Sequence, residues 1–209
     1  CNLKTLAYLP PFITELKIEN GMFEEIDCDI PETVEKMTII MTPLKSLKRL
    51  PKYLAHIVLK NVEMEELNFD ECENLETIDI TYSEVKKVVS WGKNPAYKIY
   101  MKGNYLADMD NVPDIFPLNT EYLSLAYNDI VNGAFIESIL YITKLVYLNV
   151  SYNEDLTTFT IDSSYDAYAS LTKLLIFECA LDRLDDLPKN LEYLDASQNR
   201  IEFVCPLPD

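Results

Sequence analysis

An apolar pattern that recurs every 20 to 26 residues runs along almost the whole chain and restricts its fold more than any other feature. Each copy follows the frame L-x-x-L-x-L-x-x-N-x-L, in which apolar residues fill most of the L positions. Because chance matches rarely recur nine times in so narrow a range of spacings, the pattern indicates a chain of similar stacked units. The nine copies begin at Ile13, Val34, Leu54, Leu75, Ala96, Thr120, Leu145, Leu171 and Leu191.

Several copies also carry a proline three residues before the first apolar position. The resulting form, L-P-x-x-L-x-x-L, is clearest at residues 187–194 and resembles the short repeats of some bacterial and viral leucine-rich repeat proteins. Together with the nine copies of the frame, it identifies the chain as a member of the leucine-rich repeat family, with short 20–21 residue repeats and some longer ones. The prolines are Pro10, Pro31, Pro51, Pro117 and Pro188.

The resemblance implies an α/β solenoid, curved as a right-handed horseshoe, with one parallel sheet on its concave face. In each strand, alternate side chains point into the solenoid and those between them point outward. Proline lacks a backbone donor and resists helix, which favours extended or turn-like convex segments. The longer repeats near Ala134–Ile142 and Tyr165–Leu171 have room for a helical turn or two. Strands are expected near Leu16, Met37, Ile57, Ile78, Ile99, Leu123, Leu148, Leu174 and Leu194.

The two ends of the chain are out of phase with a complete repeat. Cys1–Leu6 matches the second half of a repeat, and Cys205–Asp209 matches the approach to another strand. Because terminal repeats usually need polar caps that protect the core, we expect residues 1–209 to be a single domain of about nine repeats, cut from a longer array. A lipoprotein acylation site at Cys1 is the alternative explanation of the N-terminal cysteine.

The ninth repeat position carries side chains that can satisfy the backbone of the buried turn after each strand. It is asparagine in four later repeats, where a buried amide both donates and accepts hydrogen bonds, and Cys179 in a fifth. Other residues hold the position in the first four repeats, so we predict an asparagine ladder only in the second half. The early residues are Gly21, Thr42, Val62 and Ser83, and the ladder residues are Asn104, Asn128, Asn153 and Asn199.

Composition narrows the class of partner. The chain has 18 Lys and Arg against 35 Asp and Glu, which gives a net charge of -17. This charge repels phosphate backbones and anionic lipid headgroups, so neither nucleic acid nor a membrane surface is an expected partner. No apolar run approaches the roughly 18 residues of a membrane span, so membrane insertion is not expected either.

Other residue types give no sign of catalysis, cofactor or metal. The repeat frame places the five cysteines beyond disulfide reach of one another, and the lack of cysteine-flanked caps favours an intracellular compartment over secretion or the cell surface. His56 lacks further donors nearby, and the acidic run from Glu63 to Glu73 has no calcium-loop pattern. Only four glycines are present, with no nucleophile or phosphate-binding motif.

The outward strand positions form the predicted binding face. Repeat positions 3, 5 and 7 face outward, and position 8 lies at the strand edge. Six Lys and four acids lie on this face, about +2 against -17 for the chain. Tyr122 and Tyr147 share one outward column, which favours an interface over the general preference of strands for tyrosine. The predicted partner-binding residues are Tyr100, Tyr122, Tyr127, Tyr147, Tyr152, Phe177, Tyr193, Lys60, Lys98 and Lys102.

These observations lead to one principal function and two alternatives. We expect a monomeric, non-enzymatic scaffold that binds a protein partner on its concave face, as the family resemblance also implies. The first alternative is the substrate-recognition array of a larger enzyme or effector. The second is a surface adhesin, in which tyrosines stack on the sugar rings of a glycan or contact a host protein.

Overall fold

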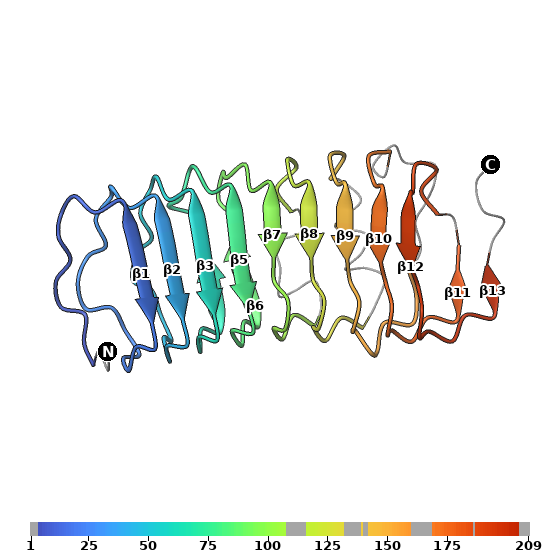
Figure 1. The fold of residues 1–209 in the computed structure, drawn as a ribbon, viewed down its shortest axis with the longest axis horizontal. Coiled ribbons are helices and arrows are strands. Elements are labelled where there is room, and N and C mark those ends of the chain that lie inside the picture. Colours follow the sequence, from blue (N-terminus) through green and yellow to red (C-terminus); the bar gives the residue numbers. More distant parts are fainter. Residues whose placement is uncertain are drawn as a thin grey trace.

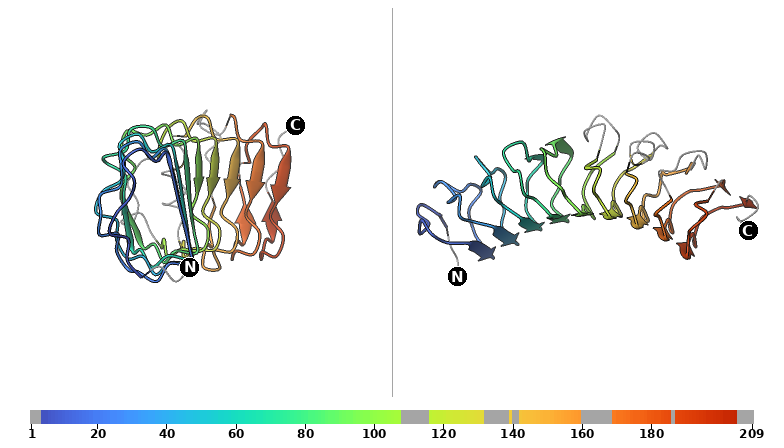
Figure 2. Two further views of the ribbon diagram at one scale, coloured as in Figure 1. Left: turned by 60° about the vertical axis from the view of Figure 1, so that its left-hand side comes forward. Right: turned by 90° about the horizontal axis from the view of Figure 1, so that it is seen from above.

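The computed structural model describes residues 4–107, 116–131, 139, 142–159, 169–185 and 187–204 as a parallel β-solenoid. One strand from each repeat joins a nine-stranded sheet (Figure 1). Seen from above, the ribbon follows an arc with this sheet along its inner, concave side (Figure 2). The strands, in order, are β1 (Glu15–Glu19), β2 (Lys36–Ile40), β3 (His56–Lys60), β5 (Thr77–Thr81), β7 (Lys98–Tyr100), β8 (Tyr122–Ser124), β9 (Tyr147–Asn149), β10 (Lys173–Leu175) and β12 (Tyr193–Asp195).

The register of the sheet confirms the predicted repeat frame. All nine residues predicted to centre the strands pair with one another in a single row, from Leu16 opposite Met37 to Leu174 opposite Leu194. Their side chains point inward, and all but Leu194, which is 36% exposed in the last strand of the sheet, are buried. The apolar period therefore sets both the strand positions and the inward face.

Each repeat proline marks a β-turn just before the strand. In all five of these repeats, the proline carbonyl accepts a hydrogen bond from the backbone N–H three residues later, as from Val34 to Pro31 at 3.0 Å and from Thr120 to Pro117 at 3.0 Å. A turn of this kind reverses the chain over four residues. The prediction of turn-like connections is thus confirmed at these positions.

The described part of the convex side carries short strands. β4 (Glu66–Asn68) pairs with β6 (Lys87–Ser90), and β11 (Arg183–Leu184) pairs with β13 (Phe203–Val204). The ranges described contain no helix, so the expected α/β class is wrong for them. The helical turns expected within 134–142 and 165–171 fall mostly outside the described residues. None of the described segments forms a helix that could cross a membrane.

A ladder of polar side chains lines the buried turns after the strands. Asn153 accepts a hydrogen bond from the Ile130 N–H at 3.1 Å and donates to the carbonyls of Leu125 and Val150 at 3.2 and 2.7 Å. Asn128 and Asn199 make the three equivalent bonds. Asn104 makes the two equivalent bonds to the preceding repeat, with the Val85 N–H and the Ile80 carbonyl. Each of these amides hydrogen bonds to backbone groups of two neighbouring repeats.

The ladder extends further into the first half than predicted. The Thr42 hydroxyl accepts a hydrogen bond from the Gly21 N–H at 3.1 Å. Ser83 Oγ donates to the Leu59 carbonyl at 3.2 Å, and its backbone N–H donates to Asn104. A hydroxyl can both donate and accept, so it replaces part of the amide's role.

We expect Asn153→Leu to destabilise the chain by about 1 to 3 kcal/mol, because buried backbone groups on both sides would lose their partner. Chemical denaturation of the purified chain measures this change. Asn190→Leu is the matched control, because Asn190 is exposed and makes one hydrogen bond, to the Ala169 carbonyl. If Asn190→Leu lowers the free energy of unfolding by more than about 0.5 kcal/mol, or if both variants lower it equally, the claim that the buried ladder stabilises the fold is contradicted.

The described cysteines are free thiols in different environments. Cys28 is partly exposed, whereas Cys72 and Cys179 are buried. Burial raises the pKa of the Cys72 thiol to about 12 and also raises the pKa of Cys179. Cys1 and Cys205 lie outside the described residues.

Alkylation of the folded chain at pH 8 should therefore modify Cys28 well before Cys72 and Cys179. The thiolate is the reactive form, and a raised pKa lowers its fraction at this pH. Peptide-resolved mass spectrometry gives the rate at each cysteine, and denaturant should abolish the difference. Equal rates in the folded chain would show that Cys72 and Cys179 are more accessible than the structure indicates.

Candidate functional site

A row of tyrosines and lysines crosses the concave face at the beginning of five neighbouring strands. The strand register places one residue from each of β7, β8, β9, β10 and β12 side by side. Each occupies repeat position 3 and points outward. We call these residues the first row: Lys98, Tyr122, Tyr147, Lys173 and Tyr193.

Side chains of the first row contact one another across the strands. The rings of Tyr122 and Tyr147 are tilted by 30° with centroids 6.1 Å apart. Lys98 Nζ lies 5.3 Å from the Tyr122 centroid, and Lys173 Nζ lies between its two tyrosine neighbours, 5.7 and 4.9 Å from the rings. Such cation–π contacts orient both partners. These contacts favour this arrangement of the row in the absence of a partner.

A second row follows the opposite edge of the sheet, where the strands end. Tyr127 and Tyr152 are stacked with centroids 3.8 Å apart, and Phe177 meets Tyr152 edge-on at 4.9 Å. Lys102 Nζ lies 4.6 Å from the Tyr127 ring and 5.6 Å from the Tyr82 ring. Hydrogen bonds with Tyr127 and Glu178 raise the pKa of Tyr152. We call these residues the second row: Tyr82, Lys102, Tyr127, Tyr152 and Phe177.

An unusual backbone conformation at repeat position 8 holds three of these tyrosines. In all nine repeats this residue has a left-handed conformation, with φ between 50° and 67°. Its N–H donates to a carbonyl of the neighbouring repeat in the first eight, as from Tyr127 to Ser151 at 3.0 Å and from Tyr152 to Phe177 at 3.0 Å. These backbone hydrogen bonds between repeats offset the cost of positive φ for a residue with a Cβ. The residues are Asn20, Met41, Asn61, Tyr82, Gly103, Tyr127, Tyr152, Glu178 and Gln198.

Small side chains lie between the two rows. Ser124, Ala126 and Ser151 occupy repeat positions that are predicted to face outward, and all three are buried. Short side chains set among large rings on neighbouring strands are covered by them. Tyr100 lies in the same strip and is partly buried, and burial raises the pKa of its hydroxyl.

The structure brings together nine of the ten predicted partner-binding residues. These nine lie on β7 to β12 or directly after those strands, whereas Lys60 ends β3 and forms an ion pair with Asp79 at 2.7 Å. Sequence reasoning missed Tyr82, although Tyr127 and Tyr152 occupy the same repeat position and were included. The glycine at position 103 was the available signal for a left-handed residue there.

Other chemistry has no visible basis in the described part of the chain. His56 lies on β3, and no group of three or more His, Cys, Asp or Glu side chains in the described ranges can hold a metal ion. The arrangement offers a rigid, ordered surface of rings and ammonium groups. Its chemistry is suited to recognition.

Comparison with known proteins supports the fold assignment. No protein-family model matches the chain, and no curated protein matches it in sequence. Among solved structures, YopM from Yersinia enterocolitica WA-314 is 24% identical with a TM-score of 0.65, covering 99% of this chain and 46% of that one. YopM from Yersinia pestis, described as a leucine-rich effector protein, is 21% identical with a TM-score of 0.57, covering 99% of this chain and 68% of that one.

A plant protein shares the architecture at lower similarity. It is the leucine-rich repeat ectodomain of the membrane receptor kinase GASSHO1/SCHENGEN3 from Arabidopsis thaliana, in complex with CASPARIAN STRIP INTEGRITY FACTOR 2. The identity is 16% and the TM-score 0.52, and the match covers 90% of this chain and 27% of that one. Together with the nine repeats, these matches show that the chain has the leucine-rich repeat fold. It spans about 46% of the length of the Yersinia enterocolitica protein.

Replacing Gly103 by alanine should disturb the second row. A Cβ at this position would overlap the Tyr82 ring, and φ there is +67°. We expect a loss of about 1 kcal/mol or more in stability, together with a displaced Tyr82 ring visible as altered aromatic NMR shifts. Gln198→Ala is the control, because that residue already carries a Cβ at φ 55°. Similar effects in both variants would mean that the Tyr82 contact is unimportant.

Proposed function

We propose that this chain is a protein-binding scaffold, with no catalysis of its own, that receives its partner on the concave face. One observation carries the proposal: two ordered rows of aromatic and lysine side chains lie in register on one rigid sheet. Tyrosine combines a large contact area with few rotatable bonds, and such residues dominate the energetics of interfaces. A column of rings facing water has no packing reason of its own.

Ordering before binding strengthens this interpretation. An interface residue that must be immobilised costs about 0.5 to 1.5 kcal/mol of affinity when the partner arrives. The ring stacking and cation–π contacts of both rows already restrict those side chains. The rows are thus suited to binding with little further loss of entropy.

The charge distribution indicates the chemistry of the partner. Lys98, Lys102 and Lys173 lie within the rows, while the chain as a whole carries -17. Lysines among rings favour a protein surface with acidic and aromatic groups over a polyanion, which the rest of the molecule would repel.

The recognition array of a larger effector is a second candidate. Its support is the likeness to YopM, described as an effector protein, of which the match covers 46% and 68% in the two structures. In this candidate the same concave face binds the target, and further segments supply another activity. The sequence of the parent protein distinguishes it from a free-standing scaffold.

Tyr122→Ala and Tyr147→Ala should each weaken partner binding by at least about 1 kcal/mol. Both rings are only partly buried, so the melting curve should change little. Partners isolated with the wild-type chain provide the ligand, and calorimetry measures the affinity. Glu202→Ala beside the convex strand β13 is the control and should affect neither quantity, since an exposed charge contributes little.

Normal binding by both tyrosine variants, with a loss in the control, would place the partner on the convex side and contradict the proposal. A glycan array provides a separate arm. Glycan binding that vanishes when Tyr122, Tyr147 and Tyr193 are changed to alanine would favour an adhesin over a protein scaffold.

A further inference from the structure

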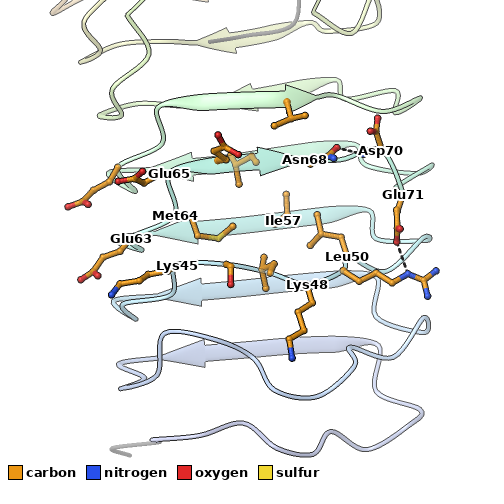
Figure 3. Close-up of a pocket in the computed structure, with 17 residues that line it drawn as sticks. Lys45, Lys48, Leu50, Ile57, Glu63, Met64, Glu65, Asn68, Asp70 and Glu71 are labelled. Carbon is orange, nitrogen blue, oxygen red and sulfur yellow. Dashed lines mark hydrogen bonds and ion pairs between the residues drawn. The ribbon is translucent and has the colours of Figure 1, made fainter.

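A cleft of about 700 Å³ opens on the convex side, between the return segments of the second and third repeats. Residues 45–50 form one wall, and residues 63–71, which include β4, form the other. In Figure 3, Lys45 and Glu63 lie at one end of the cleft, Asp70 and Glu71 lie at the other, and Met64 lies between them. This cleft is separate from the two rows of the concave face.

The two walls do not pair with each other. The first contains a single bridge residue, Ser46, and a bend at Lys48, and the second contains the three-residue strand β4. On its far side, the first wall forms a parallel bridge from Ser46 to Glu25, and the second wall pairs β4 with β6. Between the facing edges of residues 45–50 and 64–70, the described residues show no backbone hydrogen bond. An unpaired strand edge is a template for another strand.

Contacts at both ends hold the walls together. At one end the Glu63 N–H donates to the Leu44 carbonyl at 3.0 Å. At the other, Arg49 Nε donates to Glu71 at 2.6 Å and the Glu73 N–H donates to the Lys52 carbonyl at 3.0 Å. The open stretch of about six residues corresponds to roughly 20 Å of extended chain.

The floor of the cleft is apolar. Leu50, Ile57, Met64 and Leu67 line it, and each is less than 9% exposed. The lining also includes Leu47, which is partly buried, and Val89, which is 45% exposed, so a side chain that points into the cleft from an added strand would contact these two residues. Alternate residues of a strand point to opposite faces, so every second residue of such a segment would do so.

The rim is acidic. Lys45 and Arg49 are neutralised by Glu24, Glu32 and Glu71, and Glu65 pairs with Lys86. Among the described residues, the remaining four rim carboxylates form no ion pair. Lys48 is the one basic side chain of the rim that likewise forms no ion pair with a described residue. These carboxylates are Glu63, Glu66, Asp70 and Glu84.

We infer that this cleft is a second docking site, which accepts an extended peptide segment of about six residues with alternating basic and small aliphatic side chains. The segment forms a strand between the two walls and hydrogen bonds to the free edge of β4 and to residues 45–50. Its aliphatic side chains contact the floor, and its basic side chains approach the rim carboxylates. The inference does not depend on the function proposed for the concave face.

The test uses a capped peptide of three Lys-Val pairs, titrated into the full chain and followed by fluorescence anisotropy and by amide NMR shifts. We expect saturable binding with shifts in residues 45–50 and 64–70. The matching Glu-Val peptide should bind at least about tenfold more weakly, because its carboxylates are repelled by the acidic rim. A Lys-Val peptide with methylated backbone nitrogens should lose binding, because it cannot complete the strand hydrogen bonds.

Variants of the chain locate the site. Glu66→Lys with Asp70→Lys should weaken the Lys-Val peptide by about tenfold, and both residues are exposed, so the fold should persist. Glu154→Lys with Glu192→Lys applies the same change of net charge to exposed residues outside the cleft and should have much less effect. Tyr122→Ala should leave peptide binding intact, which separates this site from the concave face.

Four results would overturn the inference. They are no saturable binding at millimolar peptide, equal binding of the Lys-Val and Glu-Val peptides, undiminished binding of the methylated peptide, or shifts confined to the first and second rows. If the double variant unfolds, the single rim variant Glu63→Lys replaces it. None of these results would bear on partner binding by the tyrosine rows.

Discussion

The structure depends on satisfying the backbone of the turn that follows each strand. The inner side of this turn is covered by the mostly buried position-nine side chains, and an unpaired peptide group there costs about 1 to 3 kcal/mol. An asparagine at position nine hydrogen bonds to backbone groups of its own turn and of the preceding repeat. Asn128, for example, donates to the Leu125 carbonyl and accepts from the Leu106 N–H. Where this position is asparagine, one side chain therefore ties two neighbouring repeats together. Gly21 and Val62 have no such side chain, and their backbone N–H groups donate instead to the hydroxyls of Thr42 and Ser83 in the next repeat.

The sequence predicted this part of the fold well because period, burial and turn chemistry coincide there. Every predicted strand centre lies in the sheet, since each inward apolar residue has no other way to be buried. The proline turns were equally readable. The ladder of the first half was underestimated, because Thr42 and Ser83 do not look like asparagine although their hydroxyls make similar bonds.

Other features depend on neighbouring repeats and could not be read from one repeat at a time. The pairing of β4 with β6 joins segments 21 residues apart that carry no shared motif. The burial of Ser151 follows from the size of the rings around it rather than from its own position. Three tyrosines adopt the left-handed conformation, which usually favours glycine. Backbone hydrogen bonds from their N–H groups to the next repeat explain this conformation.

The interrupted pairing on the convex side has a mechanical consequence. In a bent rod, the outer side lengthens as curvature increases, and hydrogen bonds that span neighbouring segments resist that lengthening. The fourth return segment is tied to the third through β4 and β6, whereas the open stretch between residues 45–50 and 64–70 has no such ties. Among the first four repeats, flexing of the solenoid should therefore concentrate between the second and the third.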